Sequence, residues 1–433
     1  MRLLAAGFNA HGQLLSNAGP TISTFTEIAG SAPGEPIEVC WAGWSDVVLR
    51  IGSRYLWRGL WGEMELQVMA TQSGEEDEEA LEPLSLHSFF GTHDGCRGAI
   101  TGESMLFLLP EVSRLSEESL TCTATNLKCT YVAVNGVGRT AVVVPPASEL
   151  HNTEAPPPST STTILEFSSL DAFITYARHS SPSPSPPPYT SHTLAHAPLH
   201  ALHAGQTFHL AHTTSSLSSW AAEPRHSASL GRPTDTPTPC TTPCAVSGFS
   251  PTDDDDDDDD DGTPITKAAT CPNGHLAAAL TADGSVYIWG NAAPDFPLES
   301  AANETTEQNR LALFAVAEAD GWYPADGPLP VSIDALPDED VVDVAVGAAH
   351  VILLERTRGV WIAGSNDEGQ LGAGCWVGED EGEESGGKRG KGRRFSREFR
   401  RVDLGAAERE GGFRVTGVAG GWYATFLLVE DRD

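Results

Sequence analysis

The sequence predicts an all-β protein in which seven small antiparallel sheets form a closed ring. Three observations support this. A strand–turn–strand pattern recurs along the chain, polar glycine-rich loops follow its clearest copies, and the copy at one end is completed by residues from the other end. Repeated β units that close on themselves in this way are typical of a β-propeller, in which each repeat is one blade.

The clearest copy spans residues 341–374. It begins with a short β-rich run, VVDVAVG, and continues with AAHVILLERTRGVWIAG, which predicts a hairpin turning at Arg358-Gly359. Both halves of the hairpin are rich in β-branched and aromatic residues, which favour strands, with turn residues between them. The copy ends in a polar loop, SNDEGQLGAG.

Further copies keep parts of this pattern. In residues 265–294, His275 stands where the clearest copy has His350, and the hairpin turns at Asp283-Gly284. Residues 36–63 turn at Gly52-Ser53. The other copies lie at 205–233 and, more weakly, at 85–111 and 120–146.

The last copy is divided between the two ends of the sequence. Residues 414–431 match the first part of the repeat and then stop, and LLAAGFNAHGQLL at residues 3–15 supplies the missing strand and loop. A closed ring explains this division, because strands from both ends pair in one blade and leave no open sheet edge. With the divided unit, the chain contains seven copies and predicts a seven-bladed propeller.

The repeat resembles the regulator-of-chromosome-condensation repeat family. The shared pattern is a Gly, an apolar-His-apolar step, a turn Gly, Trp-Gly, and then Asn-x-x-Gly-Gln-Leu-Gly, found here at 366–372. The layout is similar to small stand-alone members, including fungal alpha-tubulin-suppressor-like proteins. The resemblance implies a propeller fold and two known activities, guanine-nucleotide exchange on a Ran-like small GTPase and chromatin binding.

The repeat residues have expected structural roles. Glycines allow positive φ or a close approach of neighbouring backbones. We expect Leu371 to pack inward, Gln370 to satisfy backbone groups of its loop, and Trp289 and Trp361 to pack between blades.

The composition limits the classes of partner. The chain has 433 residues, 40% of them apolar, and 26 basic against 60 acidic side chains give a net charge of −34. This charge repels nucleic-acid phosphates and anionic lipid, so we expect neither direct DNA binding nor membrane binding. No segment approaches the length of a membrane helix or a secretory signal, and we expect a monomer in the cytoplasm, the nucleus or both.

Low-complexity segments are expected as disordered loop insertions between strands, because they cannot bury apolar area. Nine consecutive aspartates occupy 253–261. The basic segment 388–394 is a nuclear-import signal, a basic contact or a solvated loop. The insertions are expected at about 74–83, 147–161, 179–200, 234–263 and 376–400.

No metal or cofactor site is expected. The eight cysteines show no framework spacing, and Cys240 and Cys244 form one pair where a zinc site needs four ligands. Pro198 interrupts a tract of histidines that would otherwise share a helical face, so we interpret most of them as loop residues. These histidines are at positions 192, 196, 200, 203, 209 and 212.

Motifs for covalent catalysis are missing from the sequence. NGVGRTA at 135–141 contains the glycine spacing of a dinucleotide-binding turn, but β-branched residues and two prolines follow it where a helix is required. A hairpin turn is the better interpretation. Asp46 has no histidine that can be placed beside it, and we expect no catalytic residue.

Three functions remain. The first is an interaction scaffold whose loops bind protein partners on a ring face. The second is exchange activity on a Ran-like small GTPase, and the third is association with chromatin or histones. The candidate partner-binding loops carry Asn9, His11, Gln13, Arg225, His226, Arg232, Asn291, Asp295, Asn366, Asp367 and Gln370, with connection between blades as the alternative role for each loop.

Overall fold

The computed structural model describes the chain in segments that together contain 28 strands and one helix. The described residues are 1–60, 62–68, 85–92, 94–109, 120–145, 161–178, 188–194, 198–213, 216–223, 229–234, 239–249, 263–291, 331–332, 340–372, 395–404 and 412–432. The aspartate run 253–261 and the basic segment 388–394 lie outside these residues.

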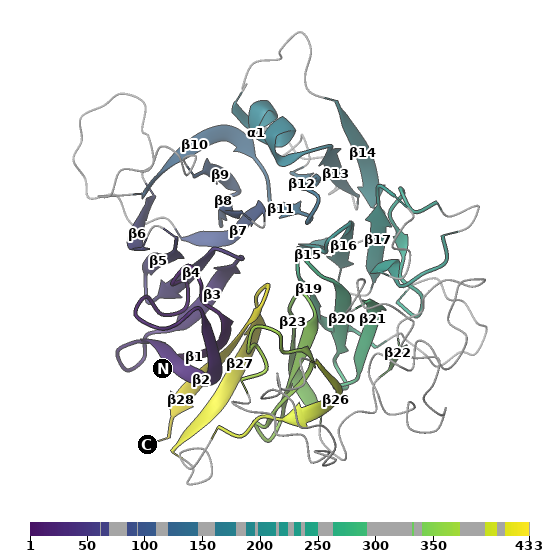
Figure 1. Ribbon diagram of the computed structural model, residues 1–433. Coiled ribbons are helices and arrows are strands. Elements are labelled where there is room, and N and C mark those ends of the chain that lie inside the picture. The colour runs from purple at the N-terminus through teal and green to yellow at the C-terminus, as the bar shows by residue number, and fades with distance from the viewer. Residues whose placement is uncertain are drawn as a thin grey trace, which may run out of the picture.

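Seven four-stranded antiparallel blades form a ring (Figure 1). Blade 1 contains β3 (Ile37–Ala42), β4 (Asp46–Ile51), β5 (Arg54–Gly59) and β6 (Gly62–Val68), and blade 2 contains β7 (Leu86–Thr92), β8 (Gly95–Thr101), β9 (Met105–Leu108) and β10 (Leu120–Lys128). Blade 3 contains β11 (Tyr131–Val134), β12 (Thr140–Val144), β13 (Thr162–Phe167) and β14 (Tyr189–Leu194), and blade 4 contains β15 (Leu199–Ala204), β16 (Phe208–Thr213), β17 (Leu217–Ala221) and β18 (Cys244–Ala245). Blade 5 contains β19 (Ile265–Thr270), β20 (His275–Thr281), β21 (Val286–Asn291) and β22 (Val331–Ser332), and blade 6 contains β23 (Val341–Val346), β24 (His350–Glu355), β25 (Val360–Ser365) and β26 (Phe395–Arg401). Blade 7 contains β27 (Phe413–Gly420), β28 (Ala424–Asp431), β1 (Arg2–Phe8) and β2 (Thr21–Gly30).

Blade 7 closes the ring with two strands from each end of the sequence, which confirms the predicted closure. β1 pairs with β28 over six positions, from Arg2 opposite Val429 to Gly7 opposite Ala424. The backbone N–H of Phe8 extends the pairing with a 2.8 Å bond to the carbonyl of Tyr423. In Figure 1 the two ends of the chain lie side by side at this blade. The amino-terminal segment supplies β2 as well as the one strand that the repeat pattern predicts.

The core consists of seven clusters of buried apolar side chains, one between each pair of neighbouring blades. β24 shows how one strand serves two clusters. Val351 and Leu353 pack toward blade 5, and Ile352 and Leu354 pack toward blade 7. Successive side chains of a strand point to opposite faces, so a strand buried on both faces is apolar without alternation. The run HVILLE reflects this burial.

In blades 6 and 7, a glycine in the third strand allows close packing against the second strand. Gly7 has φ +130° and Gly364 has φ +117°. A Cβ atom on Gly7 would lie 2.1 Å from the carbonyl oxygen of Tyr423, and one on Gly364 would lie 2.3 Å from that of Ala349. The repeat therefore needs glycine here for both reasons, the backbone conformation and the lack of space.

Blades 1 and 2 are joined at their outer edges, which the repeat pattern did not predict. β6 runs parallel to β10, with Leu66 opposite Leu120, so the two blades form one eight-stranded sheet. Residues 120–128 are thus the fourth strand of blade 2. The predicted copy at 120–146 was wrong in its start, because blade 3 begins at Tyr131.

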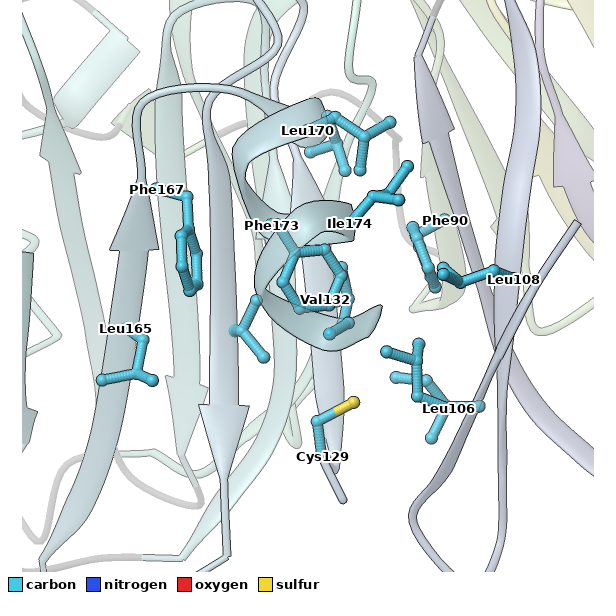
Figure 2. Close-up of a cluster of buried hydrophobic side chains, with 14 residues drawn as sticks. Phe90, Leu106, Leu108, Cys129, Val132, Leu165, Phe167, Leu170, Phe173 and Ile174 are labelled. Carbon is cyan, nitrogen blue, oxygen red and sulfur yellow. The ribbon is translucent and has the colours of Figure 1, made fainter. Parts of the chain in front are cut away.

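Helix α1 (Leu170–Arg178) lies between blades 2 and 3. The Ser169 hydroxyl caps the helix by accepting the N–H of Ala172 at 3.1 Å. Figure 2 shows Phe173 and Ile174 between Phe90 of blade 2 and the strands of blade 3. This helix was not predicted from the sequence. Within the described ranges, no helix has the length and apolar character needed to cross a membrane.

Three of the expected insertions contain strands. β14 and the start of β15 lie in 179–200, β18 lies in 234–263, and β26 begins within 376–400. Cys240, Val246 and Phe249 of the second segment are buried in the cluster between blades 4 and 5. These boundaries were therefore too wide, since serine, proline and threonine outnumber the few apolar residues that mark the strands.

The hairpin interpretation of NGVGRTA is confirmed. β11 and β12 pair directly, with Val134 opposite Thr140, and the turn between them is closed by the Asn135 N–H bonded to the Arg139 carbonyl at 2.9 Å. Gly138 takes φ +86° in this turn. The glycines serve the turn, and no helix follows them.

We expect a chain that lacks residues 1–15 to aggregate. The deletion removes β1, leaves the edge of β28 unpaired and exposes the cluster between blades 7 and 1. Size-exclusion chromatography with light scattering and thermal melting measure the effect. Deletion of the aspartate run 253–261 is the control and should leave a monodisperse protein. A truncated chain with the parent's melting temperature and monodispersity would contradict ring closure by β1.

We expect Gly364→Ala to lower the free energy of unfolding by about 2 kcal/mol or more. Alanine at this position would have to adopt a positive φ, and its Cβ would clash with the carbonyl oxygen of Ala349. Urea unfolding measures the change. Gly102→Ala is the matched control, because a Cβ on Gly102 meets no atom within 4 Å, and its effect should stay below about 1 kcal/mol. Equal effects of the two substitutions would disprove the role assigned to Gly364.

Candidate functional site

The strands that precede the four predicted partner-binding loops all end on the same face of the ring. In an antiparallel four-stranded blade, the turn between the first and second strands and the loop between the third and fourth strands fall at the same end. The predicted loops at 9–13, 225–232, 291–295 and 366–370 follow β1, β17, β21 and β25, each the third strand of its blade. We name this side the loop face, and the side with the turns between second and third strands the opposite face.

The loop after β1 is braced by its own polar side chains. The Asn9 amide donates to the carbonyls of Leu15 at 2.9 Å and Gly19 at 3.0 Å, and its oxygen accepts the N–H of Leu15. Gln13 donates to the carbonyl of Trp44 at 2.9 Å, in the next blade. Each of these two side chains is only 2% exposed. Gln13 connects blades 7 and 1, which is the alternative role considered for this loop, and Asn9 braces the loop itself.

The loop after β25 repeats this bracing. The Asn366 oxygen accepts the N–H of Leu371 at 3.0 Å, and the Gln370 oxygen accepts the N–H of Glu368 at 2.9 Å. Gln370 is fully buried, and Leu371 packs inward between blades 6 and 7 as predicted. The Asn-x-x-Gly-Gln-Leu motif therefore holds a loop in shape, and the buried side chains of Asn9, Gln13 and Gln370 do not face a partner.

Arg232 is also buried and internal. Its guanidinium donates to the backbone carbonyls of Ser219 at 3.1 Å, Pro239 at 3.3 Å and Thr242 at 2.9 Å. A role for this side chain in contacting a partner is thus corrected to one in holding the end of blade 4. Asn291 ends β21, where it pairs with His275. Arg225, His226 and Asp295 lie outside the described residues.

Of the predicted candidates that the structure describes, Asp367 is exposed and His11 and Asn366 are half-buried. His11 belongs to a group of aromatic rings. The ring of Trp44 is stacked near Phe8, with centroids 6.0 Å apart, and lies edge-to-face with His11 at 5.0 Å and with Trp422 at 5.5 Å. Trp422 stacks on Tyr423 at 5.3 Å. All five side chains are half-buried. They lie on the loop face where blade 7 meets blade 1.

Exposed apolar side chains gather on this same face. Among the described residues, the exposed large apolar side chains are Leu60 at 56%, Val137 at 58% and Tyr189 at 44%. Leu60 follows β5, Val137 lies between β11 and β12, and Tyr189 begins β14 opposite Phe167. All three positions are at the loop-face ends of their strands. The N–H of Leu60 bonds to the carbonyl of Ser45 at 3.2 Å, directly beside Trp44.

We name Phe8, His11, Trp44, Leu60, Trp422 and Tyr423 the seam patch. Of these residues only His11 was predicted, because the repeat motif marks the loops after third strands. A signal was present in the turns between first and second strands. Blade 6 has Gly347-Ala348-Ala349 in that turn, whereas blade 7 has Gly421-Trp422-Tyr423. A large aromatic residue at a position where another repeat has a small one marks a candidate surface.

Asp46 lies beneath the patch and ties blade 1 to blade 2. Its carboxylate accepts the Trp41 indole N–H at 3.0 Å and the Cys96 backbone N–H at 2.8 Å. Burial raises the pKa of Asp46 to about 6, although these hydrogen bonds favour the ionised form and lower it. The carboxylate is held by packing groups, so its contacts are structural.

The histidine tract lies on strands, which corrects the prediction of loop residues. His192 is on β14, His200 and His203 are on β15, and His209 and His212 are on β16; residue 196 lies outside the described residues. Within the described part of the chain, no group of three or more histidine, cysteine or acidic residues could hold a metal ion.

Two of these histidines belong to a buried polar group between blades 3 and 4. Glu166 accepts from Arg139 at 2.8 Å and bonds to His192 at 2.9 Å. Burial alone would raise the pKa of Glu166, but these partners and the nearby His209 lower it to about 2. Burial lowers the pKa of His209 to about 4. The group ties two blades together near the loop-face ends of their strands.

Comparison with known proteins identifies the fold through structure. No protein-family model and no curated protein matches the sequence. The structure of human WBSCR16 matches with a TM-score of 0.54 and 14% identity, covering 100% of this chain and 99% of that one. Prp20p from Saccharomyces cerevisiae matches with a TM-score of 0.58 and 10% identity, covering 100% and 92%. Yeast RCC1 (Prp20), in a complex with Kap60, gives 0.58 and 11%, covering 100% and 89%.

The chain shares its fold with these structures. These matches extend over the whole ring, including the degenerate blades 1–3, where the repeat sequence is faint. Identities of 10–14% show a shared fold. The shared fold gives no role to the individual residues of the loop face.

We expect this propeller to lose stability as the pH falls from 6.5 toward 4. Burial lowers the pKa of both His209 and His350 to about 4. Between these limits the unfolded chain binds protons that the folded chain does not, so each histidine removes up to about 3 kcal/mol from the free energy of unfolding. Asp46 acts in the opposite direction. Because its pKa is raised in the folded chain, it takes up a proton there at a higher pH than in the unfolded chain, which favours the folded state on acidification.

Urea unfolding at pH 7 and pH 4.5 tests this expectation in a His350→Gln variant. The variant should lose about 2 to 3 kcal/mol less than the parent on acidification, because its buried side chain does not titrate. His87→Gln is the control, since His87 is exposed, and it should follow the parent. A His350→Gln profile that is identical to the parent's would show that His350 does not cause the loss.

Proposed function

We propose that this chain is an interaction scaffold that binds protein partners on its loop face and performs no covalent chemistry. The observation that carries the proposal is the position of Leu60, Val137 and Tyr189, the exposed large apolar side chains of the described residues, which all lie on that face. Single exposed apolar residues are ordinary on a protein surface. Three on one face, together with the half-buried aromatic rings of the seam patch, favour a surface that a partner covers.

The ring supports this role by holding the loop face rigid. Turns of neighbouring blades bond to each other around the centre of the face: Gly136 N–H to Gly205 at 3.1 Å, Gln206 N–H to Gly274 at 2.7 Å, and Ala348 N–H to Trp422 at 3.0 Å. A surface that is already ordered before binding loses little conformational entropy when a partner docks. A scaffold needs such a surface and no catalytic side chain.

The RCC1-like fold supports two narrower alternatives. The yeast Prp20p structure was reported together with that protein's binding properties to Gsp1p and histones, and yeast RCC1 was solved bound to Kap60. The first alternative for this chain is nucleotide exchange on a Ran-like small GTPase, and the second is association with chromatin through histones. The net charge of −34 disfavours direct contact with DNA. We propose a monomer of the cytoplasm or nucleus, with 388–394 as a candidate import signal.

Photo-crosslinking from defined positions tests the scaffold proposal. A photoreactive phenylalanine analogue replaces Leu60 or Tyr189 on the loop face, and Asp283, exposed in the turn between β20 and β21, serves as the control on the opposite face. We expect the loop-face positions to capture a defined protein that Asp283 does not capture. The captured protein is then purified and its affinity measured against the intact ring. Equal capture from Asp283, or no binding by the purified protein, would reject the proposal.

Release of a fluorescent GDP analogue from a panel of small GTPases separates the scaffold from the exchange factor. An exchange factor accelerates release by orders of magnitude on one GTPase. The scaffold proposal expects release at the intrinsic rate with every GTPase, while the ring is shown to be folded by its melting curve. Acceleration on a Ran-like GTPase would replace the scaffold proposal with the exchange-factor alternative.

A further inference from the structure

Cys240 and Cys244, the most closely spaced cysteines of the sequence, lie at the loop-face end of blade 4. Both are free thiols in this structure. Cys244 begins β18 and pairs with Ser219 of β17. The carbonyl of Cys240 accepts the N–H of Ala221, the last residue of β17, at 2.8 Å. The two cysteines therefore lie along one strand, opposite residues that are two positions apart.

The two cysteine side chains belong to the same face of the blade. Directly opposite residues of an antiparallel pair point to the same face, and so do alternate residues of one strand. Cys244 therefore shares a face with Ser219 and with Val246, which continues the pairing with β17. Val246, Ala221 and Cys240 all belong to the buried cluster between blades 4 and 5. Both thiols thus lie on the side of the blade that packs against blade 5.

The spacing of the pair fits a disulfide. A strand rises about 3.3 Å per residue, so Ser219 and Ala221 stand about 6.6 Å apart along β17. The Cα atoms of a disulfide lie about 4.4 to 6.8 Å apart, and the separation of Cys240 and Cys244 is at the upper end of this range. Residues 241–243 form the turn between them, and the first two of its side chains are exposed. An exposed turn can shift by a small amount without opening the core.

A buried guanidinium lies close to both thiols. Burial lowers the pKa of Arg232, and the negative charge that Cys244 and Cys240 carry as thiolates acts against this. Arg232 also donates to the carbonyls of Pro239 at 3.3 Å and Thr242 at 2.9 Å, so it holds the turn that separates the two cysteines. The cysteine pair and Arg232 form one compact group, which the scaffold function does not use.

Three of the other described cysteines are poor targets for oxidation. Burial raises the pKa of Cys129 and Cys271 to about 12, and burial is also the main cause that raises the pKa of Cys40 to about 12. A thiol reacts through its thiolate, so these three react slowly at neutral pH. Cys244 is half-buried and within reach of a small oxidant, whereas Cys240 is buried beside it.

We propose that Cys240 and Cys244 form a reversible disulfide when the chain meets hydrogen peroxide. The peroxide oxidises the half-buried thiol of Cys244 to a sulfenic acid and is itself reduced, with release of one water. The sulfur of Cys240 then attacks this sulfur. The S–S bond forms, the S–O bond breaks, and the hydroxyl group leaves as a second water with the proton of the Cys240 thiol. A dithiol reductant returns two electrons and two protons and restores both thiols.

The bond links the end of the loop after β17 to the first residue of β18. It closes a ring that contains the turn 241–243, and this turn carries one of the carbonyls that hold Arg232. Oxidation therefore fixes the loop-face end of blade 4. The site goes beyond the proposed scaffold function, since the bond forms or fails to form without any partner.

Mass spectrometry of the full chain tests the proposal. The protein is treated with hydrogen peroxide, alkylated and digested, with and without later reduction by dithiothreitol. We expect the segment that contains both cysteines to lose two hydrogen atoms and to escape alkylation in most of the protein, and to regain both thiols on reduction. Alkylation at both positions after peroxide would overturn the proposal. A sulfinic acid at Cys244 without the bond, or a disulfide between two chains, would overturn it as well.

Two serine substitutions distinguish a specific bond from general oxidation. Cys244→Ser removes one partner, and Cys40→Ser is the matched control at another half-buried cysteine. We expect Cys240 to stay a free thiol in Cys244→Ser, and we expect Cys40→Ser to form the disulfide like the parent. A melting curve of each reduced variant shows that it is folded. Equal protection of Cys240 from alkylation in the two variants would show that Cys244 is not its partner.

Hydrogen exchange measures the effect of the bond on the turn. We expect the backbone N–H groups of Thr241, Thr242 and Cys244 to exchange severalfold more slowly in the oxidised chain, because the bond limits opening of the turn. Equal rates in the oxidised and reduced chains would overturn the effect assigned to the bond.

Discussion

The fold depends on one constraint, that both faces of every blade are apolar and need a neighbour. Side chains of β24 alternate between two clusters, one with blade 5 and one with blade 7, and each of the seven interfaces has such a cluster. An open row of blades would leave one apolar face at each end exposed to water. The ring removes both ends, and the pairing of β1 with β28 holds it closed. The backbone interlock at Gly7 and Gly364 sets how closely strands within a blade approach.

The same constraint confines functional variation to the ends of the strands. Residues within the strands face two clusters and are committed to packing, whereas the turns and loops beyond them are not. At the junction of blades 7 and 1, two such turns carry Trp44 and Trp422, and the braced loop after β1 adds His11. In the loop after β1, the structural motif and the candidate binding surface use different side chains. Buried Asn9 and Gln13 fix the conformation of the loop after β1, and this loop presents the half-buried side chain of His11 at the surface.

Much of the fold could be predicted from the sequence, because repetition reports packing directly. The seven copies, the hairpin turn at Gly52-Ser53 and the completion of the last blade by residues 3–15 are all confirmed. The predictions that failed concern single elements and not the architecture of the ring. The outer strand 120–128 belongs to blade 2 because its pairing with β6 and β9 is a tertiary contact that no repeat pattern encodes. Helix α1 had a visible signal, Ser169 as a cap and apolar residues at 170, 173, 174 and 177, but it interrupts a β repeat and was not sought.

The candidate site was harder to predict, since a repeated motif marks what every blade needs. Asn366 and Gln370 recur because each loop must satisfy its own backbone groups, and recurrence gives no information about a partner. The informative positions are those that differ between repeats, such as Trp422 against Ala348. Their meaning depends on which turns lie side by side in the ring.

Blade 7 takes two strands from each end of the sequence, and this sets the order in which the chain can fold. Arg2 and Asp431 bond across 429 positions of sequence, and β1 finds its partner β28 only after six other blades lie between them. Local blades can form hairpin by hairpin, but the strand of the ring that is synthesised first is among the last to gain its second neighbour. During synthesis β1 and β2 have apolar side chains and no sheet to join. A chaperone that shields this leading hairpin would act on the stage of folding at which the ring is most exposed to misassembly.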